Sequence, residues 1–108
     1  MRDSKIQKLV DEIVQGFHPE RVILFGSCAY GKADWDSDVD LLVIMNTRKN
    51  TLEAAVKIRQ AVTHQFPIDI IVRTPGQIRK RLRWGDSFIR EIMEKGKVLY
   101  EAPGKRMD

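Results

Sequence analysis

The sequence contains little of several residue types that would quickly narrow its function. It has one cysteine, Cys28, and two histidines among 108 residues. A single cysteine cannot form an internal disulfide, so nothing requires an oxidising compartment and we expect a cytoplasmic protein. No apolar run approaches the length of a membrane span, and the charges scattered through the amino-terminal segment are unlike a signal peptide. These absences argue against a disulfide-stapled secreted domain and against a membrane protein.

The overall composition is that of an ordinary globular domain. Hydrophobic residues make up 43% of the chain and charged residues 31%, which fits one compact domain over residues 1–108. Only the end of the chain, residues 103–108, reads as a flexible tail. The formal net charge of +4 is modest. This charge suits a small anionic ligand such as a nucleotide as well as a nucleic acid, so it does not distinguish between the two.

Helical and strand patterns alternate along the chain. Apolar residues at helical spacing with Ser4 as a possible N-cap predict the first helix, and short β-branched runs predict strands. A brief helix could follow the first strand, opening at Ser27. The expected helices cover residues 4–17, 54–65, 75–85 and 87–96, and the expected strands cover residues 21–26, 38–45, 68–74 and 97–101. This order predicts an α/β (α+β) fold with a mixed sheet of about four strands packed against helices.

Three aspartates fall where strands are expected. Asp38 and Asp40 lie two residues apart, so on a strand they project from the same face, about 6.6 Å apart along the chain. Asp69 stands between two apolar residues at the start of the next strand, and a paired strand would lie about 4.8 Å away. The spacing therefore predicts that three carboxylates meet on one sheet face.

A solvated sheet face is the simplest explanation of such acids, and it suffices for Asp34 and Asp36 in the preceding loop. It fits the strand acids less well, because Asp is disfavoured in strands and the apolar run over residues 41–44 indicates a strand covered on both faces. Two like charges at about 4 Å repel by about 4 kcal/mol at an effective dielectric of 20, so the cluster needs a cation or a proton. All-oxygen ligands favour Mg²⁺ or Mn²⁺, and without a neighbouring histidine zinc is disfavoured.

A Gly-Ser turn precedes these acids. Gly26 allows a close approach of backbone to a ligand, and Ser27 would present a hydroxyl and free N–H groups to an anion such as a triphosphate. Alone, Gly-Ser is a weak signal and usually just a turn. Followed by Asp-x-Asp in a strand and by a later strand acid, the turn becomes specific.

Three segments between Leu24 and Val72 read "LFGS", "DSDVDLLV" and "PIDIIV". In these segments the chain resembles the minimal nucleotidyltransferases of the DNA polymerase beta-like superfamily. The resemblance implies a metal-dependent transfer of AMP from ATP, on a palm-like nucleotidyltransferase fold. Carried across, Gly26 and Ser27 would hold the β- and γ-phosphates, and Asp38 and Asp40 would bind Mg²⁺ or Mn²⁺. Asp69 would complete the metal cluster and accept the proton of the attacking hydroxyl.

One position departs from the family pattern. Many members carry an arginine in the turn after Gly-Ser, where this chain has Cys28 and Tyr30, so Lys32 or Arg73 would have to supply the charge. Larger members also carry an acceptor-binding domain, which this sequence lacks. The resemblance thus implies that the acceptor arrives on a partner, in a homo- or hetero-oligomer. In the minimal family this is often a HEPN toxin encoded nearby, which some members inactivate by adding AMP to a tyrosine.

Two classes of function follow from these features. The first is a protein adenylyltransferase acting as an antitoxin, which the intact acid triad favours. The alternative is a catalytically weak binding module that neutralises a toxin by occlusion, which the missing turn arginine favours. Incubation with labelled ATP, Mg²⁺ and the product of the neighbouring gene discriminates between them.

The other conspicuous residues have simpler explanations. His18 and His64 fall in a turn and at a polar helix end, where a catalytic role is not expected. Trp35 is either a loop lid or a ring near the incoming base, and Trp84 is expected to pack against the sheet. The basic stretch Arg79–Arg83 is equally well a solvated helix face or a docking site for a partner. Aromatics do not interleave with its charges in the sequence, so nucleic-acid binding is disfavoured.

Overall fold

The computed structural model describes residues 2–29, 38–63 and 66–103. Its elements follow the expected alternation of helices and strands. In chain order they are α1 (Arg2–Phe17), β1 (Arg21–Phe25), β2 (Val39–Ile44), α2 (Thr51–Ala61), β3 (Ile68–Arg73), α3 (Pro75–Arg83), α4 (Ser87–Lys95) and β4 (Lys97–Glu101). None of the described helices is both long enough and apolar enough to cross a membrane.

The strands form one four-stranded mixed sheet in the order β3-β2-β1-β4. β1 pairs antiparallel with both β2 and β4, whereas β2 and β3 run parallel. The parallel pair is connected through α2, since parallel strands require a crossover. The expected α+β fold with a mixed sheet is therefore confirmed.

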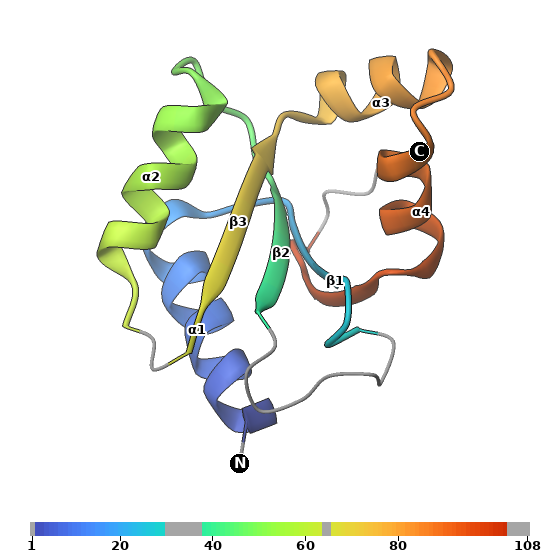
Figure 1. Cartoon of the computed structure of the whole chain (residues 1–108). Coiled ribbons are helices and arrows are strands. Elements are labelled where there is room, and N and C mark those ends of the chain that lie inside the picture. Colours follow the sequence, from blue (N-terminus) through green and yellow to red (C-terminus); the bar gives the residue numbers. More distant parts are fainter. Residues whose placement is uncertain (1, 30–37, 64–65, 104–108) are drawn as a thin grey trace.

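Helices cover both faces of the sheet (Figure 1): α1 and α2 lie on one side, and α3 and α4 on the other. Alternate residues of the central strands feed two separate cores, as the two-residue period of a strand requires. On β2, Leu41 packs with the residues of α1 and α2, and Leu42 packs with those of α3 and α4. Both are fully buried, which confirms that β2 is covered on both faces.

Several element boundaries differ from the sequence expectation. α1 begins at Arg2, so Ser4 lies inside the helix and is not its N-cap. α2 begins three residues earlier than expected because Asn50 caps it, its side chain accepting a hydrogen bond from the Leu52 N–H at 2.7 Å. After β1, residues 27–29 form a turn in which the Ala29 N–H donates to the Gly26 carbonyl at 3.0 Å. The brief helix expected over residues 27–33 lies partly outside the described residues.

Candidate active site

The strand acids gather at one end of the sheet. Asp40 and Asp69 are direct partners in the register of the parallel strands β2 and β3, near the start of each strand. Asp38 immediately precedes β2. In Figure 1 these strand starts lie at the lower end of the sheet, where β1 also ends.

Asp40 and Asp69 project toward the side of the sheet that α3 and α4 cover. Asp40 is the register partner of Phe25 on β1, and Phe25 belongs to the core formed with α3 and α4. Cross-strand partners share a face, so Asp40 and Asp69 project to that same side. Asp40 is half-buried, whereas Asp38 and Asp69 are exposed. The acids thus form the open, solvent-reaching edge of an otherwise apolar face.

The environment of Asp40 resists its ionisation. Its pKa is raised above the ordinary aspartate value, first by burial and then by the negative charges of Asp69 and Asp38. The influence of both neighbours on one carboxyl group means that the three acids share a common electrostatic field. A cation bound among them would relieve the repulsion and lower this pKa.

The Gly-Ser turn closes against the acids. Gly26 has a positive φ of 74°, a conformation that non-glycine residues rarely adopt. A Cβ atom at this position would collide with the carboxylate of Asp40. The backbone conformation therefore favours glycine at position 26, and any side chain there would have to displace the Asp40 carboxylate. The next residue, Ser27, is exposed and opens the turn beside this contact.

No described residue of the turn supplies the positive charge that many family members have there. Cys28 is partly buried, and its thiol donates to the backbone carbonyl of Asp38 at 3.3 Å, which ties the turn to the start of β2. Arg73 does not take the place of the missing arginine, because it lies four residues beyond Asp69 on β3, about 13 Å along the strand. Lys32 and Tyr30 lie outside the described residues, as do Asp34, Trp35, Asp36 and His64.

The donor set fits a hard divalent cation. The acids offer only carboxylate oxygens, the ligands that Mg²⁺ and Mn²⁺ prefer. Within the described part of the chain, no three acidic, histidine or cysteine side chains already form a ready-made metal cage. A cation here would be held by carboxylates together with oxygens from a bound ligand, as is common for Mg²⁺.

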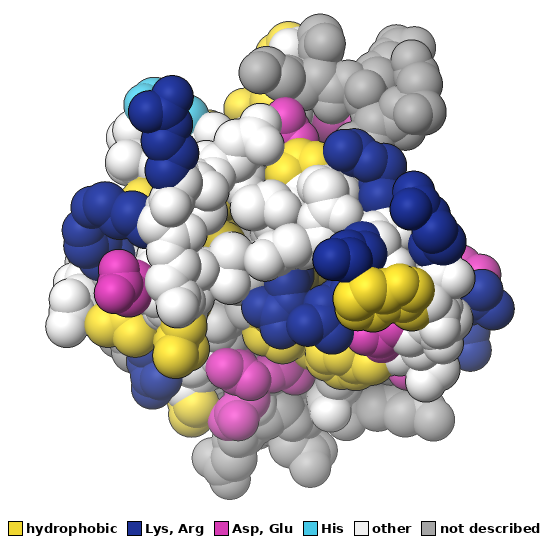
Figure 2. Space-filling model, turned by 90° about the horizontal axis from the view of Figure 1, so that it is seen from above, with side chains coloured by type: hydrophobic (Ala, Val, Ile, Leu, Met, Phe, Trp, Pro, Cys, Tyr) yellow, Lys and Arg dark blue, Asp and Glu magenta, His cyan; other side chains and the backbone are white. Residues whose placement is uncertain are grey.

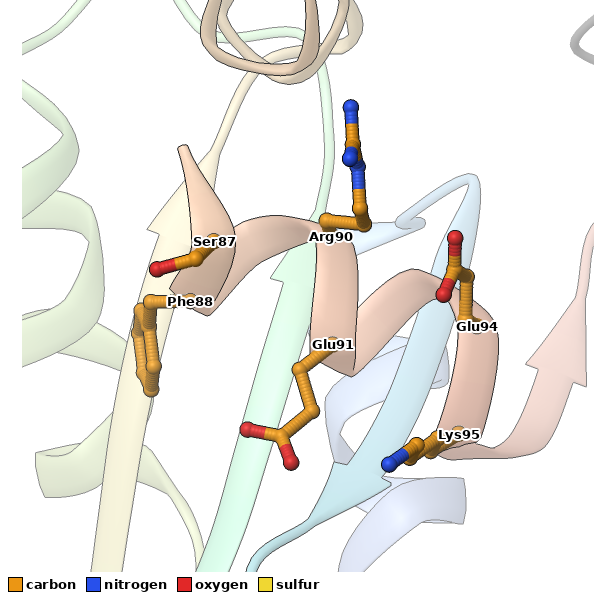
Figure 3. A pocket seen from close by; sticks show the side chains of 6 residues that line it. All are labelled: Ser87, Phe88, Arg90, Glu91, Glu94 and Lys95. Atoms are coloured by element: carbon orange, nitrogen blue, oxygen red, sulfur yellow. The ribbon is translucent and has the colours of Figure 1, made fainter. Parts of the chain in front are cut away.

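A shallow hollow of about 500 Å³ lies on α4 (Figure 3). The lining residues that the structure describes come from α4: Ser87, Phe88, Arg90, Glu91, Glu94 and Lys95. The Phe88 ring is half exposed and meets the Phe25 ring edge-on, with 5.7 Å between their centroids. Because Phe25 is the register partner of Asp40, Phe88 connects the hollow to the acids. Sequence reasoning missed Phe88, which adjoins the buried Ile89 and reads as core.

The basic stretch lies at the other end of the sheet. Arg79–Arg83 belongs to α3, which starts just beyond the end of β3 and lies at the top of Figure 1. The expectation that Trp84 packs against the sheet is wrong, since 70% of its side chain is exposed. Trp84 follows the last residue of α3 and lies one helical turn from Lys80, on the outer side of the helix.

A Gly-Ser turn closed against paired strand carboxylates at one end of a mixed sheet is the arrangement that the resemblance to nucleotidyltransferases implies. The nucleotidyltransferase domain family matches residues 4–99, so the chain belongs to this family and is an enzyme of the nucleotidyltransferase class.

Individual relatives agree with this assignment. A Methanocaldococcus jannaschii protein named "putative protein adenylyltransferase" is 30% identical over 82 residues, covering 75% of this chain and 78% of that protein. A crystal structure of a "putative nucleotidyltransferase" from Sulfolobus solfataricus superimposes with a TM-score of 0.64 at 17% identity, covering 96% of this chain and 84% of that one. This likeness supports the fold.

A toxin–antitoxin crystal structure with AMP-PNP is also similar, with a TM-score of 0.55 and 25% identity. The match covers 95% of this chain and 76% of that chain.

Proposed function

We propose that this protein is a cytoplasmic antitoxin that transfers AMP from ATP to a tyrosine hydroxyl of a HEPN-type toxin, in a reaction that depends on Mg²⁺ or Mn²⁺. The observation that carries the proposal is the register pairing of Asp40 with Asp69 beside the closed Gly26 turn. Two carboxylates and the Gly-Ser turn thus lie together at one end of the sheet. The single cysteine fits a reducing compartment.

The residues of the candidate site have separate roles in the proposed reaction. Gly26 and Ser27 bind the β- and γ-phosphates through backbone N–H groups and the serine hydroxyl. Asp69 accepts the proton of the acceptor hydroxyl. The hydroxyl oxygen then forms a bond to the α-phosphorus, and the bond from that phosphorus to the bridging oxygen of the β-phosphate breaks. The products are AMP joined to the acceptor oxygen and pyrophosphate.

Asp38 and Asp40 would hold the divalent cation, with Asp69 completing the set. The cation supplies charge neutralisation for the phosphates and for the attacking and leaving oxygens. The raised pKa of Asp40 supports this role, since the carboxyl group lies in a field of negative charge that a cation would offset.

The acceptor is proposed to be a separate protein. Support comes from a similar solved structure, a toxin–antitoxin with AMP-PNP, an analogue of ATP. The name of the Methanocaldococcus jannaschii relative, which specifies protein adenylylation, also supports it. The open hollow with the exposed Phe88 ring beside the acids gives an incoming aromatic side chain a surface to contact.

Asp69→Asn tests the transferase reading. The amide conserves volume and removes the charge and the proton acceptance, so we expect the transfer rate to fall by about 10²- to 10⁴-fold while partner binding persists. Wild type and variant are co-expressed with the neighbouring gene product, whose mass is then measured. Asp11→Asn on α1 is the matched control, because it makes the same chemical change away from the acids.

The same experiment distinguishes the transferase from an occluding module, the function that the absence of arginine from the turn favours. An occluding antitoxin protects cells equally well as wild type and as Asp69→Asn, and leaves the mass of its partner unchanged. That pair of results would replace the transferase proposal. An added AMP mass with wild type, and its loss together with lost protection in the variant, supports it.

A further inference from the structure

One outward surface of α3 carries cations and one aromatic ring. Positions 79, 80, 83 and 84 recur at intervals of three and four residues and therefore share one side of the helix. The opposite side packs Ile78 and Leu82 into the core. We call the outward set the α3 stripe; it consists of Arg79, Lys80, Arg83 and Trp84, all exposed.

The charges of the α3 stripe are not neutralised by neighbouring acids. Among the described residues, no acidic side chain forms an ion pair with Arg79, Lys80 or Arg83. Asp86 is the nearest acid in the sequence, but it pairs with Arg81 at 3.2 Å and caps α4 through the Ile89 N–H. Its charge is thus committed within the fold.

A further cation lies beneath this end of the molecule. The Nε atom of Arg73 is buried without a hydrogen-bond partner among the described residues, and its Nη1 group donates to the Val72 carbonyl at 2.8 Å. Burial, and then the positive charge of Arg81, lower the pKa of Arg73. Seen from above, Lys and Arg side chains gather over this end of the molecule (Figure 2). The end of the molecule that carries α3 therefore holds more positive charge than its described ion pairs neutralise.

The aromatic member of the stripe is accessible. Trp84 exposes 70% of its side chain, and the Lys80 ammonium lies 4.9 Å from the centre of its ring. The core of a protein interface is normally apolar and depleted of charge, with a polar rim. Here the tryptophan is surrounded within the stripe by cations instead. An indole flanked by cations matches the way single-stranded nucleic acids are bound, with a base stacked on the ring and phosphates on the charges.

We propose that the α3 stripe is a binding site for single-stranded nucleic acid, with one base stacked on Trp84 and phosphates contacted by Arg79, Lys80 and Arg83. This activity goes beyond the transfer reaction and does not depend on it. It revises the expectation from the sequence that nucleic-acid binding is disfavoured, because the helix brings Trp84 beside Lys80 on one surface. The stripe and the acids lie at opposite ends of β3, so the proposed site for nucleic acid is distinct from the acid end.

Binding is measured with a fluorescein-labelled 12-mer oligo(U) RNA and the equivalent oligo(dT) DNA, by anisotropy and by tryptophan quenching. Trp35→Phe provides the background, because the chain has only two tryptophans and Trp84 then reports alone. We expect salt-sensitive binding with quenching of Trp84. Tighter binding of the RNA or of the DNA identifies which of the two strands is preferred.

Two sets of variants separate stacking from charge. Trp84→Ala is expected to weaken binding by about 5- to 100-fold, the loss of one stacked base, and Trp84→Phe to restore most of it. Replacing Arg79, Lys80 and Arg83 by Gln is expected to lower the dependence of log K on log salt by about 2, or about 0.7 per phosphate contact. The double variant Lys8→Gln/Arg59→Gln removes exposed charges on α1 and α2 and is the control.

The proposal is overturned if neither the RNA nor the DNA oligonucleotide binds. It is overturned equally if the Trp84→Ala variant, shown to be folded by circular dichroism, binds the oligonucleotide as tightly as the parent does. It is also overturned if poly-glutamate binds as tightly as the RNA without quenching Trp84, which would assign the stripe to an acidic protein. The substitutions on α1, α2 and the α3 stripe change exposed side chains, so thermal melts close to that of the parent confirm that the comparison is made on folded protein.

Discussion

The two ends of the parallel pair β2–β3 carry opposite charge. At their starts Asp40 faces Asp69 in register, and at their ends Ile44 faces Arg73, with α3 and its cations just beyond. Between the two ends the strands are apolar and buried, for example at Leu42. About 13 Å of strand therefore separates an acidic site from a basic one.

The difference between the two ends lies in how their charges are arranged. At the acid end the like charges converge, and the pKa of Asp40 is raised by burial and by its neighbours. At the basic end the cations of the α3 stripe spread over an exposed helix surface. Converging charges select a small multivalent cation, whereas a spread surface suits an extended polyanion.

The largest expected effect is a loss of AMP transfer when the acid end of the sheet is changed but not when the basic end is changed. Asp40→Asn is expected to lower AMP transfer by about 10²- to 10³-fold and to remove the Mg²⁺ dependence of ATP binding, because it deletes a metal ligand. Arg73→Gln at the basic end is expected to change the rate of AMP transfer and the affinity for ATP by less than about twofold. Transfer is followed by partner mass and binding by calorimetry with and without chelator. A loss of ATP affinity in Arg73→Gln equal to that in Asp40→Asn would abolish the distinction between the ends.

The next effect concerns the turn that closes the acid end. Gly26→Ala is expected to reduce the free energy of unfolding by about 2–4 kcal/mol, through its positive φ and the collision with Asp40. Gly16→Ala in α1 is the matched control: apart from its chain neighbours and its own helix backbone, no described atom lies within 4 Å of the added methyl group, and helix propensity predicts a gain of about 0.5–1 kcal/mol. Urea denaturation measures both changes, and equal values for the two variants would contradict the close contact.

The smallest effect is the pH dependence of stability. Because the pKa of Asp40 is raised on folding, its contribution to stability is most favourable at low pH and declines as pH rises through the unfolded and then the folded value. At pH 7 with chelator, Asp40→Asn should therefore raise the melting temperature by about 1–4 °C, a range discounted for solvent exposure. The gain should vanish near pH 3.5, below the ordinary aspartate pKa of about 3.9. A gain that is constant with pH would argue against relieved repulsion.

Most of the acid end could be predicted from the sequence. Alternation of side chains along a strand is a local rule, so the face to which Asp40 projects followed from its position in the strand. The β-branched run after Asp69 predicted its strand equally well. The start of α2 was predicted three residues late, because the capping role of Asn50 depends on local geometry that periodicity does not reveal.

The sequence by itself determined the order of helices and strands, the burial of β2 on both faces and the candidate acids, because these follow from short-range periodicity and residue chemistry. Only the tertiary structure decided which residues share an end of the sheet. Register pairing brought Asp40 to Asp69 across 29 positions of sequence and carried Arg73 away from them. Helix packing turned Ile78 inward and left Trp84 exposed among cations. Both outcomes depend on long-range contacts, which no local pattern encodes.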